Sequence, residues 1–292
     1  YLIYFLTLLA LAYVLVNGVI ASGARRWIHI GSISIQVSEF AKVSLIIALA
    51  KYFESGKMSN QYTLKDLIIP ALMTTALGGL IVVQPDLGTT MMILFIFLVF
   101  VAAIELERKT LIKLFTGGLM LAPALWLFLK DYQKSRLLTL FNPELDPLGA
   151  GYHSIQSKIA IGSGGFWGKG LLAGTQSRLN FLPEKHTDFI FSVFAEETGF
   201  FGVVILLSLF LFVILKGLNI AFRAADRFGF FLSLGLVSSI TFYVIFNVGM
   251  TIGLFPITGI PLPLLSYGGS SLITHFFAVG LLLNVEMRRY IH

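Results

Sequence analysis

The sequence predicts an all-α polytopic membrane protein, and the evidence is its composition and the distribution of its apolar residues. Hydrophobic residues make up 57% of the 292 residues and charged residues 12%, whereas soluble domains carry about 25% charged residues. The mean hydropathy is +0.87, and apolar runs extend from one end of the chain to the other. An ordinary soluble globule and a single-pass anchor are both excluded. We therefore expect a helical bundle that forms a single transmembrane domain over residues 1–292.

Eight transmembrane helices are predicted from the apolar segments, because a helix needs about 20 residues to cross the hydrocarbon core. The last segment, residues 228–285, contains no Asp, Glu, Lys or Arg and is too long for one crossing. Its glycines and prolines, among them Gly253, Pro256 and Pro263, divide it into two helices around a non-helical middle. The six candidates before it are residues 1–20, 39–53, 67–83, 87–104, 111–129 and 189–215.

The basic residues set the predicted orientation, because Lys and Arg collect in cytoplasmic loops. The short loops on one side hold only Arg25 and Arg26. The other side is therefore cytoplasmic, which places both ends of this chain in the cytoplasm. The net charge of +6 follows from this asymmetry and does not indicate a nucleic-acid partner. The basic residues on the cytoplasmic side are Lys51, Lys57, Lys65, Arg108, Lys109, Lys113, Lys216, Arg223, Arg227, Arg288 and Arg289.

Residues 130–188 form a large extracytoplasmic loop in this topology. Loops of such length in compact proteins are usually functional. Pro143, Pro147 and Pro183 interrupt this one, and it has room for short helices that lie on the membrane. Cysteine is absent from the chain, which excludes disulfides, thiolate catalysis and cysteine metal sites.

The glycine-rich stretch 162–170 does not match a phosphate-binding P-loop. Ser163 stands where that motif needs its first Gly, and Gly170 stands where Ser or Thr must follow Lys169. We expect a flexible loop here that lets Lys169 approach a ligand.

Arg25, Arg26 and Trp27 lie in the first outer loop. The planar guanidinium group suits phosphate recognition. The alternative interpretation is a tryptophan in the interfacial belt, with basic neighbours on the lipid headgroups.

Glu39 and Lys42 are three residues apart on a predicted helix, so they can pair on one face. Ionisable groups inside a membrane point to function by default, and a structural ion pair is the alternative. Asp86 lies in an outer turn, where it is well placed to cap the helix that begins at Leu87.

The densest polar cluster precedes the predicted helix 189–215. Asp188 lies at the membrane boundary, where desolvation could tune it toward a general base; the alternative is a helix cap. His186 and Asp188 alone make a poor metal site. Glu196 and Glu197 lie two turns further in, and we expect one of them to face polar partners in the bundle.

The segment 266–271 follows a proline-rich outer stretch. Broken backbone at membrane depth is tolerated only where it is buried in protein or lines a cavity. Transporters use such breaks for substrate sites, so the residues alone leave a transporter open.

Four motifs in register across nearly the whole chain resemble the SEDS family, whose members polymerise, or were once proposed to flip, cell-wall lipid precursors. Each motif alone is weak, and the four together are highly specific. They are Gly23–Ile28 with Gln36–Lys42, Gln84–Thr89, His186–Phe191 with Ala195–Glu197 and Gly199, and Gly259–Pro263 with Ser266–Ser270.

Further segments, Asp146–His153, Gln156–Gly164 and Gly174–Gln176, resemble the elongation-type, RodA-like members rather than the division-type, FtsW-like members. Val37 departs from the family, which usually has Pro there. The family has ten spans, so we expect its first two helices to be absent from this chain, which opens at Tyr1 directly into an apolar run.

The resemblance implies a peptidoglycan glycosyltransferase that polymerises lipid II at the outer face of the bacterial cytoplasmic membrane during cell elongation. The acceptor 4-hydroxyl would attack the anomeric carbon of the lipid-linked chain with inversion. Asp188 matches the family's essential aspartate, which implies the general-base role. We expect Arg25, Arg26, Trp27, Lys42, Asp86, Lys169, His186, Thr187 and Ser270 to bind substrate, and Glu39, Glu196 and Glu197 to support the site.

The implied substrate is a disaccharide pentapeptide on undecaprenyl pyrophosphate, and apolar grooves between the helices would hold its polyprenyl tail. The implied partner is a class B penicillin-binding protein, a transpeptidase that adds crosslinks. A divalent cation, Mg or Mn, could assist, although the sequence shows no ligand set for a metal. The alternatives are a lipid II flippase and a non-catalytic scaffold of the wall-synthesis complex.

Overall fold

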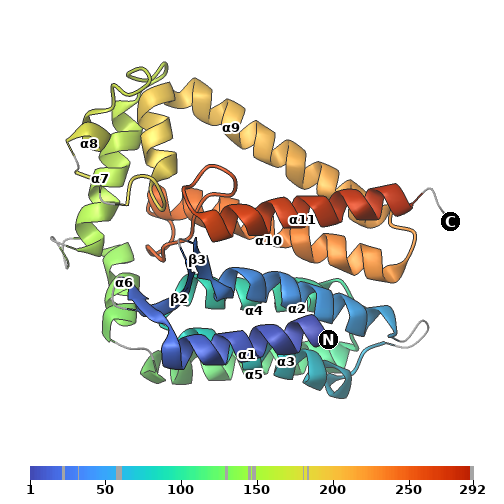
Figure 1. The fold of residues 1–292 in the computed structure, drawn as a ribbon. Coiled ribbons are helices and arrows are strands. Elements are labelled where there is room, and N and C mark those ends of the chain that lie inside the picture. Colours follow the sequence, from blue (N-terminus) through green and yellow to red (C-terminus); the bar gives the residue numbers. More distant parts are fainter. Residues whose placement is uncertain are drawn as a thin grey trace. The chain divides into compact units, whose positions relative to one another are not determined.

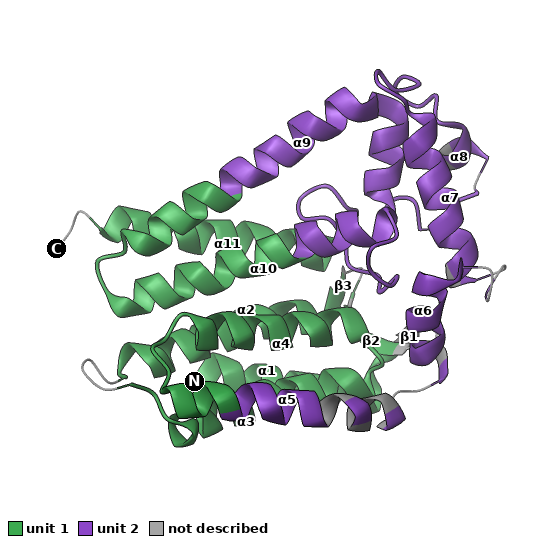
Figure 2. Cartoon of the chain, turned by 180° about the vertical axis from the view of Figure 1, so that it is seen from behind, with its two compact units in different colours: residues 1–112, 214–242, 268–292 green, residues 113–213, 243–267 purple. Residues whose placement is uncertain are grey.

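The structure is a computed structural model that describes residues 1–21, 24–31, 33–56, 61–128, 131–143, 146, 149–179, 181–182 and 184–289. Assignments made from sequence to Gly23, Lys57, Leu129, Lys130, Pro147, Leu148 and Pro183 lie outside these residues. The chain divides into two compact units (Figure 2). Unit 1 comprises residues 1–112, 214–242 and 268–292, and unit 2 comprises residues 113–213 and 243–267. The predicted single transmembrane domain stays a prediction.

Helices occupy the eight apolar segments that the sequence indicates (Figure 1). They are α1 (Leu2–Asn17), α2 (Val37–Glu54), α3 (Ile68–Val83), α4 (Leu87–Ala102), α5 (Arg108–Phe128), α9 (Ile190–Phe222), α10 (Arg227–Thr251) and α11 (Gly269–Arg288). Among the described helices, α3 with the preceding 3-10 turn η1 (Leu64–Leu67), α9, α10 and α11 are long and apolar enough to cross a membrane. α1 and α4 are shorter apolar helices. The predicted helical membrane class is confirmed, and the number of eight spans stays a prediction.

The core of unit 1 surrounds α2, which is buried along most of its length. Phe53 of α2 packs near Phe231 of α10, with ring centroids 5.5 Å apart, and Phe231 stacks on Phe100 of α4 at 5.7 Å. A Cβ atom at Gly235 would lie 2.6 Å from the side chain of Ile46. A small residue at this position therefore lets α10 approach α2 closely, as is common between membrane helices.

A three-stranded antiparallel sheet connects α1 to α2, and the all-helical prediction did not include it. Its strands are β1 (Val19–Ala21), β2 (Ala24–Ile30) and β3 (Ile33–Gln36), in that order. Trp27 pairs with Gln36, and Gly31 takes a left-handed φ of 62° in the turn between β2 and β3. The alternation of isoleucines with polar residues here has the period of a strand, which favours the sheet over a plain loop.

Unit 2 contains the long segment between α5 and α9, and it holds the short helices that were predicted there. They are α6 (Asp131–Phe141), α7 (Ala150–Ser163) and α8 (Thr175–Arg178). The unit also contains the first part of α9, the end of α10 and the non-helical stretch 252–267. The break predicted in the last apolar segment is thus confirmed.

α9 is kinked at Gly199, where φ is 67° and ψ is −167°. The glycine-rich turn after α7 packs against this kink through backbone hydrogen bonds. Phe200 N donates to Gly165 O at 2.9 Å, and Lys169 N donates to Glu196 O at 3.0 Å. The expected flexible loop is therefore a docked turn.

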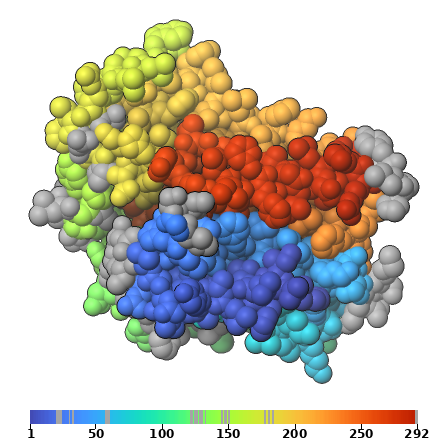
Figure 3. Space-filling view, in the orientation of Figure 1, coloured from blue at the N-terminus to red at the C-terminus, as the bar shows by residue number. Residues whose placement is uncertain are grey.

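The outer surfaces of the helices are apolar, as a lipid-facing surface requires. α11 is exposed along its length in the space-filling view (Figure 3), and Ile273, Phe276, Phe277 and Leu283 are among its exposed side chains.

Candidate active site

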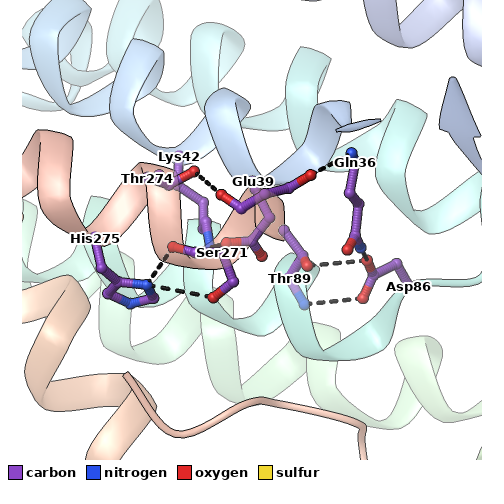
Figure 4. Close-up of polar contacts among 9 residues, drawn as sticks. Gln36, Glu39, Lys42, Asp86, Thr89, Ser271, Thr274 and His275 are labelled. Carbon is purple, nitrogen blue, oxygen red and sulfur yellow. Dashed lines mark hydrogen bonds and ion pairs between the residues drawn. The ribbon is translucent and has the colours of Figure 1, made fainter. Parts of the chain in front are cut away.

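A buried ion pair lies at the centre of the polar cluster in unit 1 (Figure 4). Lys42 Nζ donates to Glu39 Oε2 at 2.7 Å, and the two side chains are 2% and 5% exposed. The spacing of three residues on α2 brings them together, as predicted. Buried charged side chains in folded proteins are paired, and this contact supplies each of the two groups with a partner.

Asp86 caps α4, in agreement with the local interpretation of its turn. Its Oδ1 accepts from Thr89 N at 3.1 Å, and its Oδ2 accepts from the Thr89 hydroxyl at 2.9 Å. Gln36 Nε2 approaches the same carboxylate at 3.5 Å (Figure 4). The carboxylate is buried and oriented by the helix N-terminus. Its substrate-binding role stays a prediction.

Ser270 joins α11 to β3. Its hydroxyl accepts from Gln36 N at 3.0 Å and donates to Ser34 O at 3.2 Å. These contacts hold α11 against β3. The predicted role of Ser270 in substrate binding stays a prediction.

His275 is a member of the unit 1 cluster that sequence reasoning missed. It is 4% exposed, and its Nδ1 lies 2.7 Å from the carbonyl of Ser271 (Figure 4). Because a carbonyl only accepts, Nδ1 carries a proton in this contact. His275 lies within electrostatic reach of Lys42 and Glu39. The sequence did contain a sign of this residue, because an ionisable histidine within a predicted membrane helix points to function.

The two arginines of β2 donate hydrogen bonds to carbonyls at helix ends. Arg26 on β2 donates from Nε to Gln84 O at 3.0 Å and from Nη2 to the carbonyl of Pro85. Arg25 donates from Nη1 to Val16 O at 3.0 Å. Both guanidinium groups donate to carbonyls at the C-terminal ends of helices, where the helix dipole favours a cation. Trp27 is half-buried on β2.

Asp188 lies in unit 2, in the turns just before α9. Asn247 of α10 is fully buried, and its Nδ2 donates to Asp188 O at 2.9 Å and to Ile260 O at 2.7 Å. A Cβ atom at Gly259, where φ is 73°, would lie 3.3 Å from Asp188 Oδ2. The half-buried carboxylate thus stands beside a residue without a side chain, in the non-helical stretch that follows α10.

The neighbours of Asp188 are tied to the same stretch. Ser266 Oγ donates to Thr187 O at 2.6 Å and accepts from Leu262 N at 2.7 Å. Tyr267 N donates to His186 O at 2.8 Å. His186 and Thr187 therefore contribute backbone carbonyls that fix the turn, while the predicted roles of their side chains stay predictions.

Lys169 and Glu196 form a second ion pair, in unit 2. Lys169 Nζ donates to Glu196 Oε1 at 2.8 Å, and the side chains are 28% and 0% exposed. The same oxygen accepts from Thr175 N at 2.8 Å and Gln176 N at 3.2 Å. Glu196 thus faces polar partners, as predicted, and Glu197 contributes its carbonyl to Gly170 N. The ammonium group of Lys169 is directed to Glu196, and its predicted contact with substrate stays a prediction.

No cluster of three or more His, Cys, Asp or Glu side chains able to hold a metal ion occurs in the part of the chain that the structure describes. The Mg or Mn ion considered above stays a prediction.

The predicted site residues fall into two sets, one in each unit. Unit 2 holds Lys169, His186, Thr187, Asp188, Glu196 and Glu197. Unit 1 holds Arg25, Arg26, Trp27, Glu39, Lys42, Asp86 and Ser270.

Long apolar helices, with ionisable side chains buried among them and a break in the last apolar segment, define a polytopic membrane protein. The family model of the FtsW, RodA and SpoVE cell cycle proteins matches residues 1–291. The chain belongs to this family, and the family resemblance of its four motifs is confirmed.

Relatives and solved structures match over most of their length. The peptidoglycan glycosyltransferase MrdB of Escherichia coli (strain K12) is 41% identical over 98% of this chain and 77% of that protein. A structure described as the structural coordination of polymerization and crosslinking by a peptidoglycan synthase complex has a TM-score of 0.83 and 36% identity, over 99% of this chain and 81% of that one. The Thermus thermophilus rod shape determining protein RodA has a TM-score of 0.69 and 32% identity, over 99% and 78% of the two chains.

Proposed function

We propose that this chain is a peptidoglycan glycosyltransferase that polymerises lipid II at the outer face of the bacterial cytoplasmic membrane during cell elongation. The names of its relatives confirm the predicted peptidoglycan glycosyltransferase activity. The single observation that carries the site assignment is the setting of Asp188. Asn247 and Ser266 hold its turn in place, and its carboxylate stands beside Gly259.

Asp188 is the general base in this proposal. Its carboxylate takes the proton of the acceptor sugar's 4-hydroxyl as that oxygen attacks the anomeric carbon of the lipid-linked chain. The bond from this carbon to the pyrophosphate oxygen breaks, the pyrophosphate leaves with the electron pair, and the configuration inverts. A positioned base of this kind contributes about 10²- to 10⁴-fold to a rate.

The departing pyrophosphate needs positive charge. Arg25 is exposed and holds a helix carbonyl, so it can turn toward a phosphate without breaking a buried ion pair. Lys42 and Lys169 would have to give up carboxylate partners to do so. Arg25 is therefore our first candidate for this contact, before Arg26.

A class B penicillin-binding protein is the proposed partner, because a polymerase of glycan strands needs a transpeptidase to crosslink its product. The structural relative described as a peptidoglycan synthase complex supports this pairing. We also propose that both ends of this chain lie in the cytoplasm, in agreement with its loop charges.

The test is polymerisation of labelled lipid II in detergent by the full-length protein purified with its transpeptidase, with glycan length read on a gel. Polymer from the wild type and none from Asp188→Ala, with the complex still assembled, would support the assignment. Equal polymer from both would remove Asp188 from the chemistry. No polymer from either would favour a flippase or a scaffold, because neither needs to form glycan bonds.

A further inference from the structure

The glycine-rich turn beside the kink of α9 carries a group of exposed apolar side chains, here named the interfacial patch. Trp167 is 76% exposed and Leu172 is 81% exposed. The patch also contains Phe166, Leu171, Phe200 and Phe201, all more than half exposed.

The patch is ordered by its own contacts. The Phe166 and Phe200 ring centroids are 5.6 Å apart, and those of Trp167 and Phe201 are 5.9 Å apart. Phe201 N donates to Phe166 O at 3.2 Å. Leu172 has a left-handed φ of 58°, which is costly for a residue other than Gly or Asn. The chain thus accepts backbone strain while it keeps a leucine side chain in an outward position.

The kink of α9 indicates the depth of the patch in the membrane. The part of the helix after the kink, residues 200–222, is about 34 Å long at 1.5 Å per residue, which matches a hydrocarbon core of about 30 Å. Only 6% of the most apolar window of α9 is buried in the protein, so this helix faces lipid. Arg223 follows its far end. One boundary of the hydrocarbon core therefore falls beside Phe200.

We propose that the interfacial patch inserts into the boundary between headgroups and acyl chains of the outer leaflet and fixes the depth of the kink. Tryptophan and other aromatic side chains favour this layer, because one end of the ring system is apolar and the other can hydrogen-bond. Phe200 and Phe201 of the patch are followed on α9 by the exposed apolar side chains of Val204 and Ile205. This continuity with the lipid-facing surface of the helix selects lipid over another occupant. The choice of leaflet rests on the orientation given under the proposed function; the insertion itself does not rest on the proposed activity.

The test uses the fluorescence of Trp167 in the full-length protein reconstituted into phosphatidylglycerol and phosphatidylethanolamine vesicles. The 292 residues contain three tryptophans. The double substitution Trp27→Phe and Trp126→Phe removes two of them and leaves Trp167. We expect lipids brominated near the glycerol end of the acyl chain to remove most of its emission. Lipids brominated near the chain terminus and iodide in the water should each remove less.

Strong iodide quenching with weak bromolipid quenching would overturn the proposal, because the turn would then lie in water. Weak quenching by both reagents would also overturn it, because another protein surface would then cover the patch. If the doubly substituted protein does not fold, the difference in quenching between the wild type and Trp167→Phe measures the same residue in the natural background.

Discussion

Asn247 and Asp188 are joined by a hydrogen bond of 2.9 Å from the buried side-chain amide of Asn247 to the backbone carbonyl of Asp188. The same amide nitrogen holds Ile260 O. One side chain therefore positions the proposed base and the stretch of backbone beside it. Its effect on catalysis acts through Asp188, since neither hydrogen bond involves a reacting atom.

Asn247→Leu removes both hydrogen bonds and keeps the branched shape of the side chain. We expect the polymerisation rate to fall by about 10- to 100-fold, because small misplacements of a catalytic group cost about that much. The KM for lipid II should change less than kcat, and Asn247→Gln, which keeps the amide, should recover part of the rate. Thr251→Val is the matched control on α10, since it removes a buried hydroxyl that bonds within its own helix. An equal loss in that control would argue against a positioning role.

Gly259→Ala places a methyl group 3.3 Å from Asp188 Oδ2, at a residue whose φ is 73°. We expect a loss of most polymerisation activity together with a destabilisation of about 1 kcal/mol from the positive φ. Gly162→Ala, in α7 with no atom of another segment within 4 Å of an added Cβ, is the control and should be neutral or slightly stabilising. Glycan gels and thermal unfolding in detergent measure the two effects. Wild-type activity in Gly259→Ala would show that the space beside the carboxylate is not used.

Gly199→Ala should destabilise the protein more than a glycine-to-alanine substitution at an uncrowded helix position. A Cβ atom there would lie 2.3 Å from Gly168 N and 2.7 Å from Phe166 O, and backbone atoms cannot move aside alone. Gly280→Ala, where nothing lies within 4 Å, is the control in α11. The measurement is the midpoint of thermal unfolding, and equal midpoints for the two variants would contradict the docked turn.

The Lys169–Glu196 pair should behave as a partly buried ion pair. Lys169→Met leaves the fully buried Glu196 carboxylate without its cation, which costs about 3–5 kcal/mol in a buried pair and less here because Lys169 is 28% exposed. Adding Glu196→Gln should restore part of the loss. The exposed pair of Lys51 and Glu54 is the control, and its disruption should change the stability little, because solvent screens exposed ion pairs. Additive losses in the unit 2 double variant would show that the two groups do not interact.

His153 of α7 should make stability depend on pH. Burial lowers its pKa, the charge of Arg136 lowers it further, and the charge of Asp146 opposes both effects. The folded chain then binds fewer protons than the unfolded chain once the pH drops below about 6.5, so acid should destabilise the folded state. The thermal midpoint of the wild type should fall on acidification more than that of His153→Gln. Parallel curves would assign the pH dependence to other groups.

The sequence predicts the helices well because their apolar runs are local properties of the chain. The contact of Glu39 with Lys42 is predictable for the same reason, since the two residues share one helix. Arg26 could not be placed this way, because its carbonyl partners are remote in sequence and lie at the end of another helix. The sheet was missed because α-helical runs surround its short strands.

The sequence analysis did not select Asn247 and His275 as site residues, because both lie within long apolar segments that predict membrane helices. A polar side chain in such a run was a usable signal. Its partners could not be inferred, because the carbonyls of Asp188 and Ile260 become available only where the backbone leaves the helix.

The close backbone contact between Gly168 and Gly199 at the α9 kink also limits which amino-acid substitutions this chain can accept in evolution. A Cβ atom at Gly168 would lie 2.2 Å from Glu197 O, and one at Gly199 would lie 2.3 Å from Gly168 N. Neither glycine can accept a side chain while the other segment keeps its path. Mutational routes through this junction therefore require coordinated changes in both segments, and a designer who wishes to alter one must rebuild the other.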